Sequence, residues 1–597
     1  MGHNINIIVL LLFGLVNLSI NAVIKNNRTY YPEGLYSPED DVQILTVINF
    51  DATIYGSEKA WMVEFYSNWC GYCQRAAPVF KEFATDIKGW SDVVGVGALD
   101  CANDVNTPIC TYFEVTKYPT FKYFHENYEE GPTNLGLRII ADSHTNVSEH
   151  RKNLVDILES EQFNGRGQIF PNLRPFNETE LNKLFNIPSP NLTYAFLIIQ
   201  ESTDDIGPSI TMDFHNVDSA VVRYSYVNDT FLKKDLFPAL YVIEKDSGLQ
   251  FLSIPSPSRE GFKKTIVEYL TSKNVTLPEE HSYRNNSQFE IQETTSQNDT
   301  LLRQKIKAMG DVVFQGDLES SLRYSLKHEV GGAKEISGEK LKSLRAYIDV
   351  LVKYFPFSTN GKSLLNQIRT YAYSRDHIDG TEIRKLVVDA DKPGKHVFSS
   401  PQQWLACRAS GSAHRGYPCS LWKMFHYLTI NAANAESGVK DSNPRVVLEA
   451  MYGYIKNFFS CEDCANHFVE MAGRREFYKV PSWNESILWL WRAHNEVNKR
   501  LSGDETEDPE YPKIQFPSKA YCPQCYRADD SWNEAEVLVY LKKMYSYENI
   551  RYMGSDPQVL HFDKMPMPSS SKNLKALGTN IPLVMAGMLV SFGLRGE

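Results

Sequence analysis

Two short cysteine motifs constrain what this chain can fold into. Cys70 and Cys73 follow Trp69 near the N-terminal end, and Cys461 and Cys464 repeat the spacing near the other end. Two cysteines separated by two residues can form a disulfide that opens and closes by thiol exchange. The sequence therefore predicts electron-pair transfer between dithiols that lie in two different parts of the molecule.

The length and charge of the chain narrow the class of protein. With 597 residues it has room for several domains of about 100–200 residues each. Its hydrophobic content of 42% and aromatic content of 12% are typical of globular proteins. The net charge is −11 and no long basic run is present, so we expect no nucleic-acid partner.

The N-terminal segment and the sequons predict a secretory protein. An apolar run from Ile7 to Val16 is too short to span a bilayer and is followed by small residues up to Ala22, which is typical of a signal peptide. Eight Asn-x-Ser/Thr sequons are expected glycosylation sites: Asn27, Asn146, Asn177, Asn191, Asn228, Asn274, Asn285 and Asn298. A ninth sequon, at Asn484, lies inside the C-terminal region and is not expected to carry a glycan if its helix packs closely. We therefore expect an oxidising lumen (ER or Golgi) and secretion.

The ten cysteines form five local pairs. Besides the two motifs these are Cys101/Cys110, Cys407/Cys419 and Cys522/Cys525, which we expect to be structural disulfides. A redox role for the last pair is less favoured, because it lacks a histidine or an aromatic cage apart from two tyrosines. A zinc site built from the two distal Cys-x-x-Cys units is also disfavoured, because they lie far apart and no paired histidines accompany them.

The hydrophobic pattern predicts several domains. Strands at 60–66, 92–99 and 120–124 with a helix at 73–87 form a βαβ unit, and a second α/β segment without cysteines repeats the Tyr-Pro motif as Phe237-Pro238. The apolar tail is shorter than the roughly 20 residues of a spanning helix, so its membrane attachment stays open. The expected order is a signal peptide at 1–22, a redox-active α/β domain at 23–164, a cysteine-free α/β domain at 165–275, a linker at 276–300, a helical spacer at 301–395, a helical domain at 396–550, a polar linker at 551–580 and an apolar tail at 581–594.

The first cysteine pair lies where a strand gives way to a helix. A helix that starts near Cys73 places Cys70 at its N-terminus, where unpaired amides and the helix dipole favour a thiolate. Cys73 would then be the resolving thiol. Glu64 on the preceding strand could carry protons, or be an ordinary exposed strand residue, and Tyr118-Pro119 could supply a cis peptide bond opposite the pair.

The second pair is surrounded by aromatic and imidazole side chains at helical spacing. Trp422 and His426 are four residues apart, Cys464 and His467 are three apart, and His494 lies three residues after Trp491. Each of these residues alone is more often part of a core. Together beside a dithiol they favour a flat, heteroaromatic redox cofactor inside a helical bundle.

Two resemblances support this interpretation. The segment Val63-Glu64-Phe65-Tyr66 up to Trp69-Cys70-Gly71-Tyr72-Cys73, with the later Tyr118-Pro119-Thr120, resembles a thioredoxin domain of the protein disulfide isomerase kind over residues 40–150. In that family histidine often stands where Tyr72 is found here. Its absence implies a weaker oxidant.

The C-terminal region resembles the FAD-binding domain of the Erv/ALR sulfhydryl oxidases. The similarity rests on Arg415-Gly-Tyr-Pro-Cys419-Ser-Leu-Trp422, on Cys461-x-Asp463-Cys464-x-x-His467 and on Trp491-x-x-His494-Asn495-x-x-Asn498. Phe516 stands where that family usually has tryptophan, which keeps an aromatic face and loses the indole N–H. The resemblance implies FAD contacts at Arg415, Trp422, His426, Asp463, His467, Trp491, Arg492, Ala493, His494, Asn495, Glu496, Val497, Asn498, Lys513 and the ring of Phe516.

The order of the segments is similar to that of the quiescin sulfhydryl oxidases. This implies a multidomain fold, with two α/β thioredoxin-like domains followed by an all-α spacer and an all-α FAD-binding helical bundle. The implied function is a FAD-dependent sulfhydryl oxidase that passes electrons from Cys70/Cys73 to Cys461/Cys464, then to FAD and O2, and releases hydrogen peroxide. Cys461 is expected to be the more accessible cysteine of its pair, and 276–300 the hinge that lets the domains move.

The implied partners are reduced client proteins with paired thiols and molecular oxygen, and the chain is expected to be a monomer. Two other functions stay open on the residues alone. An isomerase would use Cys70 and Cys73 without a flavin, and a non-catalytic thiol-binding or adhesion protein would keep all five pairs as permanent disulfides.

Overall fold

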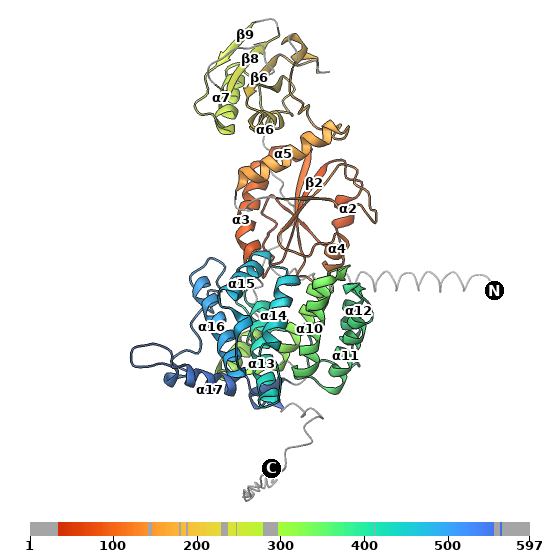
Figure 1. Cartoon of the computed structure of the whole chain (residues 1–597). Helices are drawn as coiled ribbons and strands as arrows, with labels where there is room; N and C mark the ends of the chain where they lie inside the picture. Colours follow the sequence, from red (N-terminus) through yellow and green to blue (C-terminus); the bar gives the residue numbers. More distant parts are fainter. Residues whose placement is uncertain are drawn as a thin grey trace, which may run out of the picture.

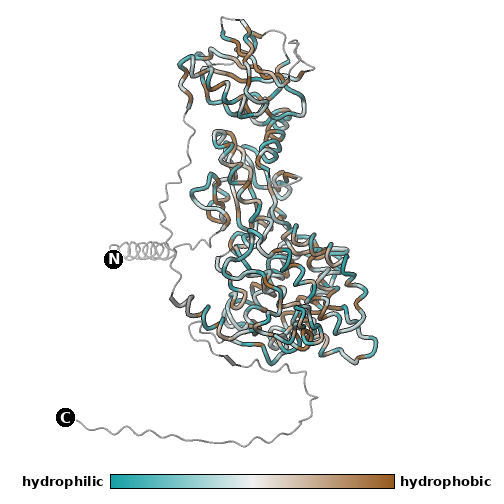
Figure 2. The backbone as a smooth tube through the Cα atoms, turned by 90° about the vertical axis from the view of Figure 1, so that its left-hand side faces the viewer, coloured by the Kyte–Doolittle hydropathy of each residue, from teal (hydrophilic) through white to brown (hydrophobic). Residues whose placement is uncertain are grey.

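The computed structural model describes residues 34–140, 146–177, 181–186, 189–227, 237–245, 248–278, 297–411, 413–553 and 562–563. The expected signal peptide, Asn27, Asn228, Asn285 and the apolar tail lie outside these residues. Within them, no helix is both long and apolar enough to cross a membrane. Figure 1 shows three bodies stacked end to end, and the view of Figure 2 keeps the same order.

The middle body in Figure 1 is a five-stranded sheet with helices on both sides. Its strand order is β1-β3-β2-β4-β5, in which β1, β2 and β3 are parallel to one another, β4 is antiparallel to β2, and β5 is antiparallel to β4. Every residue of β2, β3 and β4 is buried, as expected for the centre of a sheet covered on both faces. Its elements are β1 (Gln43–Leu45), α2 (Phe50–Ile54), β2 (Ala60–Tyr66), α3 (Gly71–Asp86), η1 (Lys88–Trp90), β3 (Val94–Asp100), α4 (Thr107–Tyr112), β4 (Thr120–Phe124), β5 (Leu137–Ile139) and α5 (Val147–Phe163).

The body at the top repeats this sheet without its first strand. Its order is β7-β6-β8-β9, and its pairs run parallel, antiparallel and antiparallel, as do β3-β2-β4-β5. Phe237–Pro238 is a cis peptide before β8, as Tyr118–Pro119 is before β4. Its elements are η2 (Leu181–Phe185), β6 (Tyr194–Gln200), α6 (Ile206–Asp213), β7 (Ala220–Tyr226), β8 (Ala239–Glu244), β9 (Leu249–Leu252) and α7 (Arg259–Ser272).

The lower body is helical. Helix α9 packs on α13 and α10 on α14, so the segment expected to be a spacer shares one hydrophobic core with the segment expected to bind FAD. Helix α8 begins at Gln297, inside the range predicted as a linker, of which 279–296 lies outside the described residues. The elements are α8 (Gln297–Ala308), β10 (Val313–Phe314), α9 (Gln315–Tyr324), the π-helical turn η3 (Ser325–Val330), β11 (Ile336–Ser337), α10 (Gly338–Tyr354), α11 (Thr359–Tyr373), β12 (His377–Ile378), α12 (Gly380–Ala390), α13 (Gly416–Glu436), α14 (Val446–Asn457), α15 (Glu462–Arg474), η4 (Phe477–Lys479), α16 (Trp483–Leu501), η5 (Pro523–Cys525), α17 (Glu534–Met544), η6 (Tyr547–Asn549), β13 (Ile550–Met553) and β14 (Phe562–Asp563).

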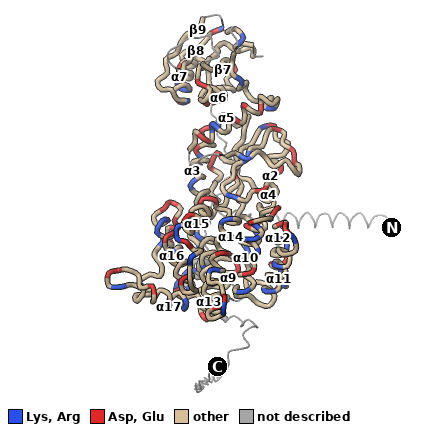
Figure 3. Tube along the Cα trace, in the orientation of Figure 1, with Lys and Arg blue, Asp and Glu red and all other residues tan. Residues whose placement is uncertain are grey.

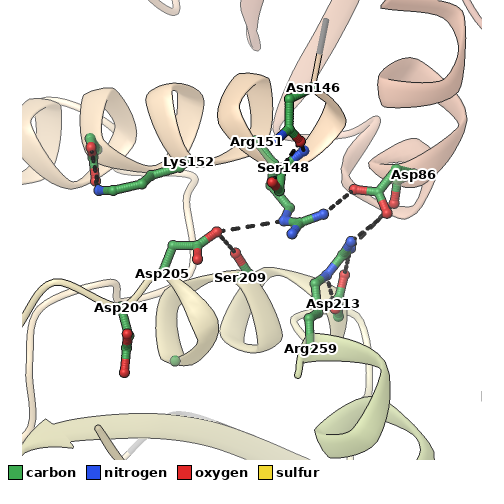
Figure 4. Close-up of polar contacts among 12 residues, drawn as sticks. Asp86, Asn146, Ser148, Arg151, Lys152, Asp204, Asp205, Ser209, Asp213 and Arg259 are labelled. Carbon is green, nitrogen blue, oxygen red and sulfur yellow. Dashed lines mark hydrogen bonds and ion pairs between the residues drawn. The ribbon is translucent and has the colours of Figure 1, made fainter. Parts of the chain in front are cut away.

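Charged residues of both signs are interspersed over all three described bodies (Figure 3). At the contact between the two thioredoxin-like bodies they are paired across the interface (Figure 4). Arg259 of α7 binds Asp86 at the end of α3 at 2.6 Å and Asp213 at 2.5 Å. Trp90 of the first body donates its indole N–H to Asp213 at 2.9 Å, and Arg151 of α5 also binds Asp86, at 2.9 Å. Because only 6% of the Arg259 side chain is exposed, this ion-pair network is partly shielded from water.

Replacement of Arg259 by Met should loosen the contact between the first two bodies. The change leaves the Asp86 and Asp213 carboxylates facing each other without their shared cation, which costs roughly 3 kcal/mol for a buried pair. Calorimetry of the full chain should show a lower Tm for the unfolding of these bodies. Lys152→Met removes the exposed Lys152–Asp156 pair and should cost at most about 0.5 kcal/mol. Equal shifts for the two variants would contradict the assignment.

Candidate functional site

The first dithiol lies at the start of helix α3, as the sequence predicts. Cys70 is the N-cap residue of α3, and Cys73 lies one turn inside it. Both are free thiols and both are fully buried. The Cys70 thiol donates to the carbonyl oxygen of Tyr118 at 3.9 Å, and the Tyr118–Pro119 peptide is cis. The segment before β4 therefore covers the thiol that begins the helix.

Glu64 lies buried in the same sheet and not on an exposed strand face. Its side chain accepts a hydrogen bond from the Tyr36 hydroxyl, and burial raises the pKa of its carboxyl group to about 8. Burial also raises the pKa of Cys73, and the hydrogen bond with Cys70 and the charges of Cys70 and Glu64 add to this effect. The Glu64 carboxyl group lies close enough to Cys73 to raise its pKa, and it can be neutral or charged near neutral pH. Glu64 is therefore a suitable proton acceptor for Cys73.

The second dithiol lies at the start of another helix. Cys461 is the N-cap residue of α15 and is bonded to Cys464. The expectation that Cys461 is the more accessible cysteine is not met in this arrangement, because Cys461 is fully buried and Cys464 only partly. The first thioredoxin-like body covers Cys461.

Backbone hydrogen bonds join the two dithiol segments. Tyr118 N–H donates to Ser460 C=O at 2.8 Å, and Glu462 N–H donates to Tyr118 C=O at 3.4 Å. Tyr118 and Cys461 thus form a parallel β-bridge. The same Tyr118 carbonyl also accepts from Cys70, so one residue contacts both dithiols.

Polar side chains surround this bridge. Arg75 of α3 binds Asp463 of α15 at 2.8 Å, and Lys117 donates to the carbonyl oxygen of Phe459 at 2.9 Å. Asp463, which the resemblance assigned to FAD, therefore also holds the two bodies together. On the far side of the interface Asp104 binds His328 at 2.5 Å.

A cavity of about 170 Å³ lies behind the second dithiol. Cys464 and His467 line one part of it, and Trp422, Phe468 and Val497 provide apolar surface. An apolar slot beside a thiol suits a flat ring system. The cavity thus brings together residues of α13, α15 and α16 that the sequence predicted to share one cofactor.

Two neutral histidines lie next to this cavity. His426 and His494 are joined by a hydrogen bond between Nε2 and Nδ1 at 3.1 Å, and the His494 ring stacks on Trp422 at 4.3 Å. Burial lowers the pKa of His426 to about 3. Burial and then the charge of His426 lower the pKa of His494. The rings are therefore polar but uncharged at neutral pH.

Positive side chains gather around the histidines. Burial lowers the pKa values of Lys423 and Lys513, and Arg415 lowers both further by repulsion. The guanidinium of Arg415 lies over the ring of Tyr511 at 4.1 Å. Asp317 and Asp508 also lie close to these basic groups. Three basic side chains grouped in this way suit a diphosphate group. Together with the apolar slot, these residues fit FAD.

Not every residue of the segment 491–498 faces the cavity. Glu496 and Val497 line it, and Ala493 is buried in the core. Arg492 pairs instead with Glu485 and Glu534. His494 lies against His426 and Trp422 as described above, and the other three members hold the loop that carries Phe516. Trp491 and Asn495 both donate to the carbonyl oxygen of Phe516, at 2.5 and 2.8 Å, and Asn498 donates to that of Ile514 at 3.1 Å.

The other cysteines are bonded as expected. Disulfides link Cys101 to Cys110, Cys407 to Cys419 and Cys522 to Cys525. The zinc alternative needs the four distal cysteines together as thiolates, whereas each of these pairs is closed in its own disulfide.

Sequence reasoning missed two contributors to the site. Lys423 stands between Trp422 and His426, and this place in the motif is the signal that could have marked it. Trp69, from the first thioredoxin-like body, lines the cavity together with Cys464. No local pattern points to this second contact, because the two residues lie in different bodies.

Comparisons with known families agree with this geometry. Three family profiles match: thioredoxin over residues 41–136, the flavin adenine dinucleotide (FAD)-dependent sulfhydryl oxidase family over 311–410, and the Erv1/Alr family over 419–517. The second profile spans α9 to α12 and the segment up to α13, in line with the core that these helices share with the C-terminal helices.

Relatives match over most of the chain. Sulfhydryl oxidase 1 of Gallus gallus is 32% identical over 526 residues, which is 86% of this chain and 68% of the relative. Sulfhydryl oxidase 2 of Homo sapiens is 30% identical over 528 residues, which is 86% of this chain and 73% of the relative. A solved sulfhydryl oxidase fragment of human QSOX1 is 36% identical, covers 40% of this chain and 98% of its own, and superposes with a TM-score of 0.37. The chain belongs to the sulfhydryl oxidase family and is a FAD-dependent enzyme that oxidises thiols to disulfides with O2 as the acceptor.

Proposed function

We propose that the chain oxidises paired thiols of client proteins at Cys70–Cys73 and relays the electrons to Cys461–Cys464. A client thiolate attacks the Cys70–Cys73 disulfide at Cys70, and the second client thiol then releases the oxidised client and leaves the reduced dithiol. The observation that carries this proposal is the backbone bridge between Tyr118 and Cys461. It brings the free thiols of the first body to a closed disulfide of the second.

The transfer between the two pairs takes two exchanges. The Cys70 thiolate attacks Cys461, which forms a Cys70–Cys461 bond and releases Cys464 as the leaving thiolate. The Cys73 thiolate then attacks Cys70 and releases Cys461. One electron pair has moved, and the ionised form of Glu64 accepts the proton that Cys73 gives up. Tyr118 holds the two segments in register during both exchanges.

Bound FAD would supply the two-electron chemistry that links the reduced second dithiol to O2, with hydrogen peroxide as the product. Cys464 lines the cavity and is therefore the cysteine assigned to face the ring system. Trp422, His426, His494 and Val497 would hold that ring, and Arg415, Lys423 and Lys513 the phosphates. The apolar walls keep water away from the reacting sulfur.

We further propose that the enzyme works as a monomer in the lumen of the secretory pathway and after secretion. Among the expected glycosylation sites, Asn146, Asn177, Asn191 and Asn274 are exposed and so accessible to a glycan. Closed structural disulfides also favour an oxidising compartment. The apolar tail at 581–594 stays a candidate for membrane attachment.

Cys70→Ser should separate the two dithiols functionally. Because the variant cannot form the Cys70–Cys73 disulfide that a client thiolate attacks, oxygen consumption with a reduced client protein should fall to background. Slow consumption with dithiothreitol should persist, because a small dithiol can reduce Cys461–Cys464 directly. Equal loss of both activities, measured with an oxygen electrode, would rule out the relay.

Arg75→Met should slow the transfer between the bodies without changing either dithiol. It removes the ion pair to Asp463, whose partly exposed geometry is worth roughly 1 kcal/mol, so turnover with protein thiols should fall about fivefold. Lys81→Met on the same helix is the matched control, since Lys81 pairs with Asp40 inside the first body. If both variants slow turnover equally, the Arg75–Asp463 pair has no special role in docking.

Glu64→Gln should change how stability depends on pH. The pKa of Glu64 is raised from 4.5 to about 8 in the folded protein, so the folded state retains a proton that the unfolded chain releases between these values. The contribution of Glu64 to stability therefore falls as pH rises through this window. The free energy of unfolding of the variant should match the wild type near pH 4.5 and exceed it by on the order of 4 kcal/mol at pH 8. Denaturant titrations of both full-length proteins measure this, and a pH-independent difference would contradict it.

A further inference from the structure

Trp69, the residue before Cys70, lies against aromatic rings of the helical body. Its ring centre is 5.8 Å from that of Tyr324, 5.3 Å from Tyr417 and 5.4 Å from Phe459. We call these three residues the aromatic socket. They come from the end of α9, the start of α13 and the segment before Cys461, so helix packing within the helical body assembles the socket.

The contact also has a directional polar component. The indole N–H of Trp69 donates to the hydroxyl oxygen of Tyr324 at 2.7 Å. Only 9% of Trp69 and 5% of Tyr324 are exposed. A buried indole N–H needs an acceptor, and an aliphatic or phenyl side chain in the same place would leave the tyrosine hydroxyl without this donor. The site therefore distinguishes an indole from other apolar side chains.

The socket is held by the helical body itself. The Tyr324 ring stacks on His328 at 4.4 Å and packs on Tyr417 at 4.2 Å. The Tyr417 hydroxyl is in turn hydrogen-bonded to that of Tyr454 at 2.5 Å. Tyr417 and Tyr454 belong to the helical body, whereas His328 is also bound by Asp104 of the first body. The Tyr417 side of the socket is therefore held independently of docking, which limits the entropy lost when the indole enters.

We propose that the aromatic socket is a recognition site for an indole ring that directly precedes a reactive cysteine. This role rests on the relay proposed above and adds the selection of its electron donor. Seating of Trp69 aligns Cys70 with Cys461 and completes the cavity wall beside Cys464. Thiols without a preceding indole reach the second disulfide without this alignment. Trp69 and Tyr324 are thus positioning residues.

The test is a single-turnover experiment on the full-length holoenzyme with Tyr324→Phe. A reduced client protein is mixed anaerobically with the enzyme, and flavin bleaching reports electron arrival from Cys70–Cys73. Loss of one neutral hydrogen bond should slow bleaching about fivefold at saturating client. The steady-state kcat/KM for the client should not change, because capture occurs at Cys70 before docking. Bleaching by dithiothreitol, which bypasses Cys70, should also keep its rate.

Two comparisons make the result specific. Tyr373→Phe removes the exposed hydroxyl by which Tyr373, at the end of α11, donates to Asp349 of α10, and should leave every rate unchanged. The double variant Trp69→Phe with Tyr324→Phe should be no slower than the Trp69→Phe single variant, because both changes remove the same hydrogen bond. Additive slowing would show that the two groups act separately and would overturn the proposal.

The remaining outcomes separate the socket from the relay. Unchanged bleaching by the client in Tyr324→Phe would overturn the socket and leave the relay standing. Parallel slowing with the client and with dithiothreitol would mean that Tyr324 only supports the cavity, which also overturns it. If Cys70→Ser still bleached the flavin at the wild-type rate with the client, the relay itself would be wrong.

Discussion

The two hydrogen bonds of Tyr118 are the interaction on which the rest of the structure depends. They add one residue of the first body as a short parallel strand to the segment that begins α15. Backbone pairing of this kind sets register without reading side chains. Because the Tyr118 carbonyl also accepts from Cys70, the bridge aligns an attacking thiol with a target disulfide through a single residue.

The two dithiols have matching local frames and different surroundings. Each begins a helix, with its first cysteine as the N-cap and the second one turn later. The first pair is packed with the buried carboxyl group of Glu64, whereas the second opens on an apolar cavity. Proton handling and electron delivery are thus assigned to separate bodies, and each can be optimised in a different solvent environment.

Local patterns predicted much of the fold and part of the site. The strand at 60–66, the cysteine positions and the shared face of Trp422 and His426 follow from spacing along single elements, whereas the approach of His494 from α16 was expected from a shared cofactor and from the resemblance. The segment 491–498 was expected to contact FAD as a whole, yet a helix presents its residues in all directions, so Arg492 turns to Glu534 instead. Lys423 escaped notice because lysine is usually exposed. The contact of Trp69 with Tyr324 spans 255 residues of sequence, and no periodicity reports it.

The ion pairs of Arg259 have a mechanical consequence. Arg259, Trp90 and Arg151 tie the cysteine-free body to the domain that carries Cys70, Arg151 through an ion pair with Asp205 at 3.6 Å. Any domain movement that takes Cys70 from a client to Cys461 must therefore move both bodies together as one rigid unit. The cysteine-free body then adds mass to the moving unit, which slows its rotational diffusion. It also excludes partners from the face of the first body that it covers. A domain without redox chemistry thereby affects how fast Cys70 moves between its partners and which partners can approach it.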